Sequence, residues 1–235
     1  MNIEPIARIH TDFPTKFGVP RQSGLASGLV STIVFEPPYR NPDCLRGIAD
    51  FSHLWLIWEF DKVAGAGWSP TVLPPKLGGK TRVGVFATRS PFRPNPLGMS
   101  CVVLTGVRQD AKLGPVLCLS GADLMDGTPV FDIKPYLPYS DCFPDARAGF
   151  TALAPDLLLG VDFPPELLER IPEAHRSALL GVLSHDPRPS YQDDPARRYG
   201  MGFAGFDIHF TVSEGRLTVV DVVPMEPSEK GSASQ

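Results

Sequence analysis

Residues 82–107 read RVGVFATRSPFRPNPLGMSCVVLTGV. The two runs at its ends, 82–88 and 99–107, are rich in β-branched and apolar residues and are predicted to be strands. Three prolines lie between them, and proline cannot extend a central strand, so residues 90–97 are predicted to form a rigid loop. A stiff loop that carries arginines loses little conformational entropy when it binds an anion. The alternative is a structural turn whose arginines are only solvated.

Further short strands are predicted on both sides of this stretch. With 26 prolines and 22 glycines in 235 residues, the chain is rich in turns and poor in long helices. No amphipathic helical pattern occurs before residue 160, which argues against alternating strands and helices in a parallel sheet. A mainly β fold is expected, with a small β-barrel or sandwich first. The additional predicted strands are 3–10, 29–35, 51–60, 116–119 and 130–133.

The pattern changes after residue 141. Residues 143–162 are predicted to be a connector, and 164–183 have apolar residues at helical spacing that Pro172 interrupts. A polar loop (185–200) and a hairpin (203–212 with 216–223) follow. The predicted organisation is a β-barrel domain (1–145), a small α+β C-terminal domain (160–225) and a flexible tail (226–235).

Composition indicates an ordinary globular protein, with 43% apolar and 20% charged residues. No apolar run reaches the roughly 18 to 20 residues of a membrane span, and the N-terminus lacks the apolar core of a signal peptide. We therefore expect a cytoplasmic protein with no membrane partner. The four cysteines are widely spaced, so neither a metal site nor a disulfide framework is predicted. The net charge is −4, yet residues 63–108 contain six basic and no acidic residues.

Two glycine-rich stretches fail as phosphate-binding loops. Gly79-Lys80-Thr81 ends like a P-loop, but residue 74, where the first glycine belongs, is proline. Gly65-x-Gly67 lacks the third glycine and the helix that a dinucleotide-binding loop requires. Neither a nucleoside triphosphate site nor a Rossmann cofactor site is expected.

Four motifs carry a resemblance to a known family. They are FGVPRQSGL (17–25), FSHLWLIWEF (51–60), GVFATRSPFRPNPLGMS (84–100) and DLMDGTPVFDIKPYLPYSD (123–141). Together they resemble the TsaA-like/TrmO family over most of residues 3–141, and the match is looser beyond residue 185. The resemblance implies a homodimeric, non-Rossmann β-barrel methyltransferase that uses S-adenosylmethionine. Its implied substrate is the exocyclic amino nitrogen of threonylcarbamoyl-adenosine at position 37, beside the anticodon of threonine tRNAs.

The resemblance also implies cofactor contacts. Arg89 is expected to pair with the cofactor carboxylate, and Asp123 to accept hydrogen bonds from its ribose or amine. Asp61-Lys62 departs from the family pattern, which has His-Gln there, so contact at that point depends on whether the backbone or the side chains bind. The implied cofactor-binding residues are Pro20, Arg21, Gln22, Asp61, Lys62, Arg89, Met99, Ser120, Gly121, Ala122, Asp123 and Leu124.

No general base follows from spacing. Asp126 is the leading candidate for removing the proton, although an Asp before Gly is commonly structural, and the substrate's own carboxylate is an equal alternative. His53 is expected to be a core histidine. The tyrosines at the C-terminal loop are candidates for stacking on an unpaired base, while Asp193 and Asp194 lie close enough to neutralise the arginines. The expected RNA-binding residues are Lys76, Lys80, Arg82, Arg93, Arg188, Tyr191, Arg197 and Arg198.

Two other functions remain possible on the sequence alone. One is a non-catalytic module that binds S-adenosylmethionine or RNA, and the other is an enzyme of the same fold acting on a small molecule. The predicted basic loop after residue 185 argues against the small-molecule enzyme. A chain truncated after Asp141 is expected to keep cofactor binding and to lose tRNA methylation.

Overall fold

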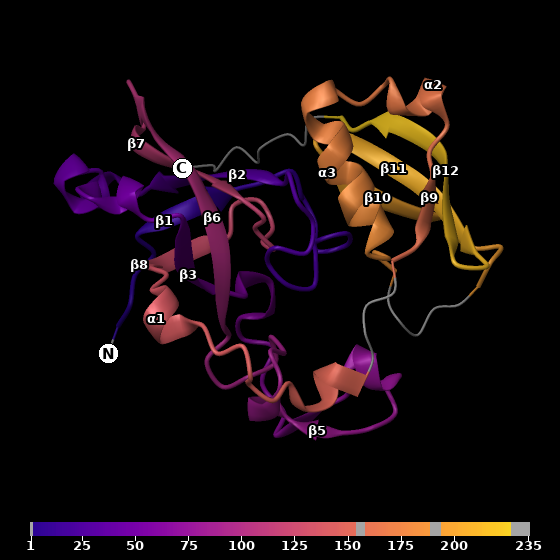
Figure 1. Ribbon diagram of the computed structural model, residues 1–235, viewed down its shortest axis with the longest axis horizontal. Coiled ribbons are helices and arrows are strands. Elements are labelled where there is room, and N and C mark those ends of the chain that lie inside the picture. The colour runs from indigo at the N-terminus through magenta and orange to yellow at the C-terminus, as the bar shows by residue number, and fades with distance from the viewer. Residues whose placement is uncertain (1, 154–157, 189–193, 227–235) are drawn as a thin grey trace, which may run out of the picture.

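Six strands of the first half pair in a closed ring in the computed structural model, which describes residues 2–153, 158–188 and 194–226 (Figure 1). The strands are β1 (Ala7–His10), β2 (Val30–Phe35), β3 (His53–Glu59), β6 (Leu97–Asp110), β7 (Gly114–Ser120) and β8 (Pro129–Pro135). Their order around the barrel is β1-β2-β7-β6-β3-β8, and all the pairs are antiparallel. The mainly β fold expected from the sequence is confirmed.

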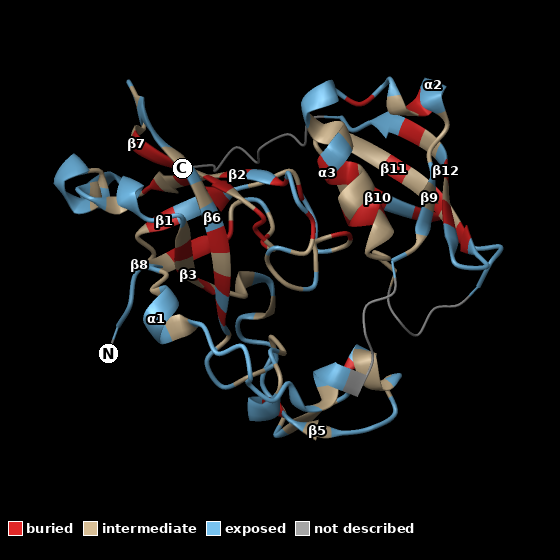
Figure 2. Ribbon diagram, viewed as in Figure 1, coloured by how far each residue is buried: buried red, intermediate tan, exposed pale blue. Residues whose placement is uncertain are grey.

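Side chains on alternate positions of each strand point inward and fill the barrel. In β3, Leu54, Leu56 and Trp58 are buried while the residues between them are half-exposed, as the period of two requires. Figure 2 shows the same alternation as bands along the barrel strands. Gly98 on β6 lies directly under Trp58, because a Cβ atom there would come within 2.3 Å of the indole ring. The glycine is what allows the large ring to lie flat against the strand.

Residues 61–96, which connect β3 to β6, contain little regular structure; we call them the β4–β5 lobe. Their only strands are β4 (Thr71–Val72) and β5 (Val83–Gly84). Of the strand predicted over 82–88, only Val83 and Gly84 are in a strand, and the rest of that prediction is wrong. The chain turns there because the Val85 amide bonds the Pro70 carbonyl (3.0 Å) and residues 85–87 enter a helical turn. Short 3₁₀ helices in the first half are Pro37–Tyr39, Pro42–Leu45, Ile48–Asp50, Asp61–Val63, Pro75–Leu77, Val85–Ala87 and Gly149–Leu153, with the α-helical turn α1 at Pro138–Asp141.

The C-terminal unit is a four-stranded sheet with helices on one face (Figure 1). Its elements are β9 (Gly160–Asp162), α2 (Pro165–Leu168), α3 (Glu173–Ser184), β10 (Tyr199–Phe203), β11 (Phe206–Ser213) and β12 (Arg216–Pro224). The strand order is β10-β11-β12-β9, with β9 parallel to β12. The break at Pro172 and the β11–β12 hairpin are confirmed. None of the described helices has the length and apolar character needed to cross a membrane.

Two strands of this sheet lie where the sequence predicts a connector and a loop. β9 has only three residues and pairs in parallel with a strand more than fifty residues away, which no local pattern reveals. β10 alternates buried Tyr199, Met201 and Phe203 with two glycines, so its period of two is present but lacks polar side chains on the outer face. The tail predicted over 226–235 lies, apart from residue 226, outside the described residues.

The two hydrophobic cores share one segment of chain. Residues 11–29, between β1 and β2, contribute Phe13, Ala26 and Leu29 to the core of the C-terminal unit, each no more than 3% exposed. Phe13 packs edge-on against Phe203 with ring centroids 5.4 Å apart. The loop that connects two barrel strands is therefore also a structural part of the second unit.

Candidate functional site

A chain of polar side chains lies at one end of the barrel. The indole nitrogen of Trp58 donates to Ser100 Oγ (2.9 Å), and this hydroxyl donates to Asp123 Oδ1 (2.5 Å). Ser100 is only 1% exposed, because the alternation of β6 turns it inward between Gly98 and Val102. A polar residue is thus buried inside the barrel, where it fixes the carboxylate of Asp123.

Asp123 occupies an electrostatically unusual place. Burial raises the pKa of its carboxyl above the ordinary value, and the Ser100 hydrogen bond and the nearby Arg89 guanidinium offset only part of that increase. The amide of Ser23 also points at this carboxylate and favours its charged form. A half-buried carboxylate with a shifted pKa and a cation near it is typical of a functional site.

Arg89 lies close enough to this carboxylate to favour its charged form, and it bonds to the loop after β1. The guanidinium of Arg89, an exposed residue, donates to the side-chain oxygen of Gln22. The same loop is fastened to the barrel by Gly121, whose carbonyl accepts from the Gly24 amide (2.9 Å) and whose amide donates to the Leu29 carbonyl (2.9 Å). Gly121 has φ +80°, a conformation that favours glycine. Three segments distant in sequence, 17–25, 85–96 and 120–124, therefore meet at this end of the barrel.

The other expected cofactor residues have different surroundings. Ala122 and Leu124 are 2% and 1% exposed in the barrel core, so only their backbone atoms are open to a ligand. Ser120 is half-buried at the end of β7. Met99, half-exposed, lies opposite Ile57 on the outer face of β6.

Asp61 and Lys62, which follow β3, form an ion pair of 2.8 Å with each other. They lie near the start of β6, because the Phe60 amide bonds the Pro96 carbonyl (2.8 Å). The side chains of Asp61 and Lys62 therefore already bind one another.

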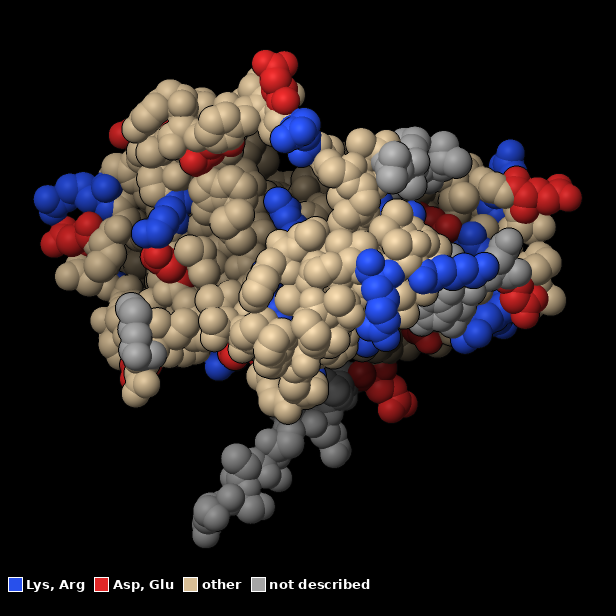
Figure 3. Space-filling view, turned by 90° about the horizontal axis from the view of Figure 1, so that it is seen from below, with Lys and Arg blue, Asp and Glu red and all other residues tan. Residues whose placement is uncertain are grey.

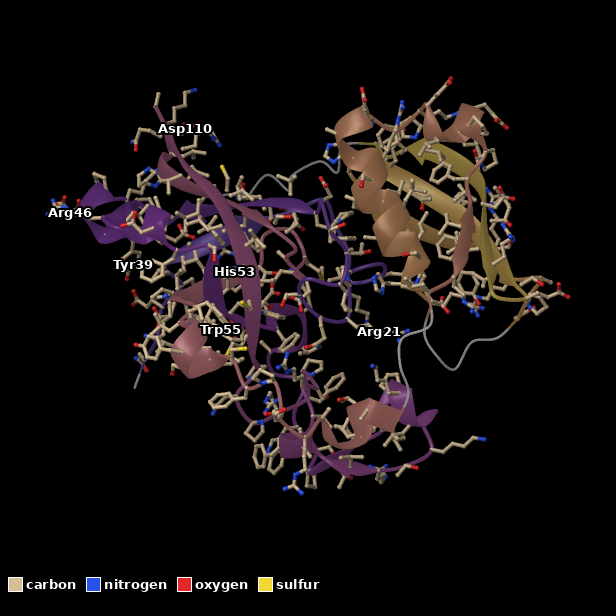
Figure 4. The ribbon with its side chains drawn as sticks, viewed as in Figure 1. Arg21, Tyr39, Arg46, His53, Trp55 and Asp110 are labelled. Atoms are coloured by element: carbon tan, nitrogen blue, oxygen red, sulfur yellow. The ribbon has the colours of Figure 1, made fainter. Side chains whose placement is uncertain are left out.

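Pro20 and Arg21 face the C-terminal unit. Both line a cavity of about 290 Å³ together with Val182 and His185 at the end of α3. The Arg21 guanidinium reaches the backbone carbonyls of Asp186 (3.5 Å) and Arg188 (3.4 Å). In Figure 4, Arg21 lies on the side of the barrel toward the C-terminal unit, far from Arg46.

Asp126 belongs to another part of the surface. Its carboxylate accepts from the amide of Thr11 (3.2 Å) and lies 3.1 Å from the ring of His10, and its amide bonds the Phe13 carbonyl. Among the described residues, no hydrogen bond links it to Arg89 or Asp123. Its contacts are those of a structural turn.

His53 is half-buried rather than part of the core, so that expectation is wrong. The alternation of β3 turns it outward, and its Nδ1 lies 2.8 Å from Ser52 Oγ.

The expected RNA-binding residues fall into two groups. In the β4–β5 lobe, Lys80 is exposed, Arg82 donates to Thr71 Oγ1 (3.0 Å) and Arg93 donates to the Thr88 carbonyl (3.1 Å). Lys76 lies on the 3₁₀ helix Pro75–Leu77 of the same lobe.

In the C-terminal unit, Arg188 forms a double hydrogen bond with Asp186 (both 2.9 Å), and Arg198 pairs with Asp221 (3.2 Å). Arg197 lies over the Tyr199 ring at 5.4 Å. Asp194 accepts from the Ala196 amide (3.0 Å), so its described bond is to a turn. Tyr191 and Asp193 lie outside the described residues.

Ser100, Trp58 and Ser23 are the site residues that sequence reasoning missed. One signal for Ser100 is present: it is the single hydroxyl at an inward position of the alternating run 98–102. A buried hydroxyl needs a partner, and the partner found here is Asp123. The Ser23 amide carries no sequence signal, because its role depends on how the loop folds back on Gly121.

The arrangement suits a ligand with both an anionic and a cationic or hydroxyl group. The exposed guanidinium of Arg89 lies close enough to the half-buried carboxylate of Asp123 to influence its charge, and an apolar barrel wall lies next to them. S-adenosylmethionine has a carboxylate for Arg89 and amine and ribose hydroxyls for Asp123, so the residues present fit it.

Comparisons with known proteins agree with this arrangement. Residues 8–142 match the model of the tRNA-methyltransferase O N-terminal domain, and residues 158–225 match that of the TrmO C-terminal domain. The chain is 39% identical to the tRNA (adenine(37)-N6)-methyltransferase of Escherichia coli K12 over 94% of this chain and 97% of that protein. It is 45% identical to the Eikenella corrodens protein of the same name, over 75% and 99% of the two chains. A crystal structure of TrmO from Pseudomonas aeruginosa superposes with a TM-score of 0.75 at 33% identity, covering 95% and 98% of the two chains. The chain therefore belongs to the tRNA-methyltransferase O family.

Proposed function

We propose that this protein transfers a methyl group from S-adenosylmethionine to N6 of threonylcarbamoyl-adenosine at position 37 of threonine tRNAs. Membership of the family supports an S-adenosylmethionine-dependent tRNA methyltransferase that acts on adenosine 37. The threonylcarbamoyl group and the threonine isoacceptors are the further parts of the proposal. One observation carries the assignment of the site: Gln22, Arg89 and Asp123 come from three distant segments and meet at one end of the barrel.

These residues have distinct parts in the proposed cofactor site. Arg89 binds the carboxylate end, and Gln22 holds the guanidinium in place through its side-chain oxygen. Asp123 accepts hydrogen bonds from the amine or ribose, with Ser100 and the Ser23 amide fixing its orientation. Bound there, S-adenosylmethionine supplies an electrophilic methyl group on its sulfonium. The hydrogen bonds of Gly121 fix the backbone beside Asp123, so a bound cofactor would be held in one orientation there, and orientation contributes to the rate of such a displacement.

The proton on N6 must leave as the new bond forms. Asp126 remains the candidate on this chain, but its carboxylate is bound to His10 and Thr11 and not to the Arg89 cluster. We therefore favour the carboxylate of the substrate's own threonyl group as the acceptor. A tRNA without that group then lacks its base, so the modified nucleotide is required for turnover.

The remaining parts of the proposal concern partners. The cations of the β4–β5 lobe and of the C-terminal unit bind tRNA phosphates, and the enzyme acts as a homodimer in the cytoplasm. We propose a division into a cofactor-binding barrel domain (1–145) and a C-terminal domain that contacts the anticodon arm (160–225). Each phosphate contact makes the affinity for tRNA fall with salt.

The test is methyl transfer from labelled S-adenosylmethionine to threonine tRNA with and without its threonylcarbamoyl group. We expect label only on the modified tRNA, and its loss in Arg89→Ala. Arg46→Ala is the matched control, because Arg46 is an exposed arginine that pairs with Asp43 in a different part of the barrel. Label on both tRNAs contradicts the role of the threonylcarbamoyl group, and full activity in Arg89→Ala contradicts the cofactor site.

A non-catalytic binding module is the second candidate, favoured by the absence of a base among the described residues bonded to Arg89 or Asp123. It predicts binding of S-adenosylmethionine without formation of S-adenosylhomocysteine in the presence of modified tRNA. Measured turnover decides between the two.

A further inference from the structure

Two phenylalanines project from the loop that carries Arg89. Phe86 is 77% exposed and Phe92 is 46% exposed, and they lie three residues before and three residues after Arg89. Exposed aromatic rings are costly in water and mark binding surfaces when they gather in one place. Trp68, 56% exposed, lies two residues before Pro70, whose carbonyl accepts from the Val85 amide (3.0 Å).

The exposure of these rings is imposed by the loop. Thr88 bonds back to the Val85 carbonyl through both its amide (3.1 Å) and its hydroxyl (2.9 Å). The Ser90 amide donates to Thr88 Oγ1 (3.3 Å), and the Phe92 amide donates to Ser90 Oγ (3.3 Å). Val85 is buried and anchors the turn, so these bonds fix the backbone from which the two rings project.

The stretch of chain that carries the rings is basic. Residues 63–108 contain no acidic residue, and Arg89 and Arg93 lie within the same loop. In Figure 3, where the β4–β5 lobe is toward the viewer, its surface is mostly uncharged, with Lys and Arg at its margin. A symmetric contact with a second copy would bring these like charges together, which costs free energy. Phosphates would neutralise them, so aromatic rings among cations suit a single-stranded nucleic acid.

We propose that Phe86 and Phe92 stack on the unpaired nucleotides that flank the methylated adenosine in the anticodon loop. The proposal rests on the proposed function, since Arg89 in the cofactor site would place the methylated base near this loop. Three residues of chain span at most about 10 Å. The two rings are therefore within reach of the bases on either side of the target, and they hold the loop open around it.

The experiment measures binding of a fluorescent anticodon stem-loop RNA at one fixed salt concentration. Phe86→Ala, Phe86→Leu and Phe86→Trp are compared, with the same three changes at Phe92. Stacking requires a flat ring, so we expect Ala and Leu to raise Kd about tenfold at either position and Trp to leave it within about twofold. Phe51→Ala is the matched control, because Phe51 is an exposed phenylalanine (37%) that precedes the start of β3, whereas the β4–β5 lobe follows the end of that strand. It should bind RNA like the unchanged protein.

Three companion measurements separate the explanations. Calorimetry of S-adenosylmethionine binding and thermal unfolding should be unchanged in all variants, which shows that the loop is intact. Sedimentation equilibrium should also be unchanged; a lower association state in Phe86→Ala assigns the rings to a contact between copies and overturns the proposal. Leu variants that bind RNA as tightly as the unchanged protein overturn it as well.

The experiments distinguish a failure of the proposed function from a failure of the stacking proposal. An unchanged protein that binds the stem-loop with the expected dependence on the rings, but does not methylate modified tRNA, leaves the stacking proposal standing. An unchanged protein that methylates tRNA while the Ala and Leu variants bind it normally leaves only the proposed function standing. If the unchanged protein does not bind the stem-loop, the stacking proposal is wrong.

Discussion

Ser100 and Asp123 are joined by a hydrogen bond in which the buried hydroxyl donates to the carboxylate. The same hydroxyl oxygen accepts from Trp58, so the carboxylate of the candidate site is connected to the packing of the barrel core. Fold and site are thereby coupled: a change in the position of the Trp58 ring is transmitted through one oxygen atom to Asp123.

Ser100→Ala should shift the acid limb of the pH profile of cofactor binding to higher pH. The Ser100 hydrogen bond lowers the pKa of Asp123 and so offsets part of the increase caused by burial. Without it the pKa rises further, and the carboxylate becomes neutral at a higher pH than in the unchanged protein. The measurement is the Kd of S-adenosylmethionine against pH. An acid limb at the same pH in both proteins contradicts the role of Ser100.

Asp123→Asn should weaken cofactor binding without lowering stability at neutral pH. Because the folded-state pKa of Asp123 is above the unfolded value, the carboxyl favours folding at low pH, and that contribution is lost as pH rises through the folded-state pKa. At neutral pH the buried charge therefore opposes folding, and asparagine removes it while still accepting from Ser100. We expect Tm at pH 7 to be unchanged or higher and the cofactor Kd to rise about tenfold or more. A clear fall in Tm, measured by calorimetry, would show that the charged form stabilises the fold.

Gly98→Ala should destabilise the barrel and the site together. A Cβ atom at Gly98 would lie 2.3 Å and 2.4 Å from two atoms of the Trp58 ring, so the ring must move and its bond to Ser100 is lost. Overpacking of this kind costs about 1–3 kcal/mol. Gly106→Ala on the same strand is the control, because nothing lies within 4 Å of a Cβ there. Urea unfolding of both variants, with cofactor binding measured alongside, checks the prediction; equal stability contradicts it.

The sequence predicts the elements whose signals are local. Pro172 marks the start of α3, and the Ser213-Glu214-Gly215 turn marks the β11–β12 hairpin, where Glu214 and Gly215 both have positive φ. The residues of the candidate site are predicted less completely from the sequence. Arg89, Gln22 and Asp123 were expected as ligands of one cofactor, but Ser100 and the Ser23 amide depend on how distant segments fold together.

The packing of the β1–β2 loop against the C-terminal unit is the feature that is hardest to predict from the sequence. Phe13, Ala26 and Leu29 have the pattern of a loop between barrel strands, yet they pack under the C-terminal sheet and α3. A chain truncated after Asp141 would expose all three to water. Contrary to the expectation from the sequence, we therefore expect such a chain to bind cofactor more weakly, because Gln22 and the Ser23 amide lie within the same segment.

A part-buried contact between His175 and Asp12 fastens this segment to the C-terminal unit. His175 Nδ1 on α3 lies 3.0 Å from Asp12 Oδ2, and the side chains are 33% and 19% exposed. The Asp12 carbonyl also accepts from the Ala204 amide (2.9 Å). Burial raises the pKa of Asp12, and His175 offsets part of the increase, so the histidine favours the charged carboxylate.

His175→Ala should therefore lower the free energy of unfolding by about 2 kcal/mol near pH 7, where Asp12 is charged and loses its partner. The loss should shrink as pH falls through the raised pKa of Asp12, since a neutral carboxyl needs the partner less. His10→Ala is the control: His10 and Asp126 are 3.1 Å apart but about half-exposed, so we expect less than about 0.5 kcal/mol. Urea unfolding at neutral and acid pH gives both values. If the two variants lose the same free energy, the contact between Asp12 and His175 does not hold the two units together.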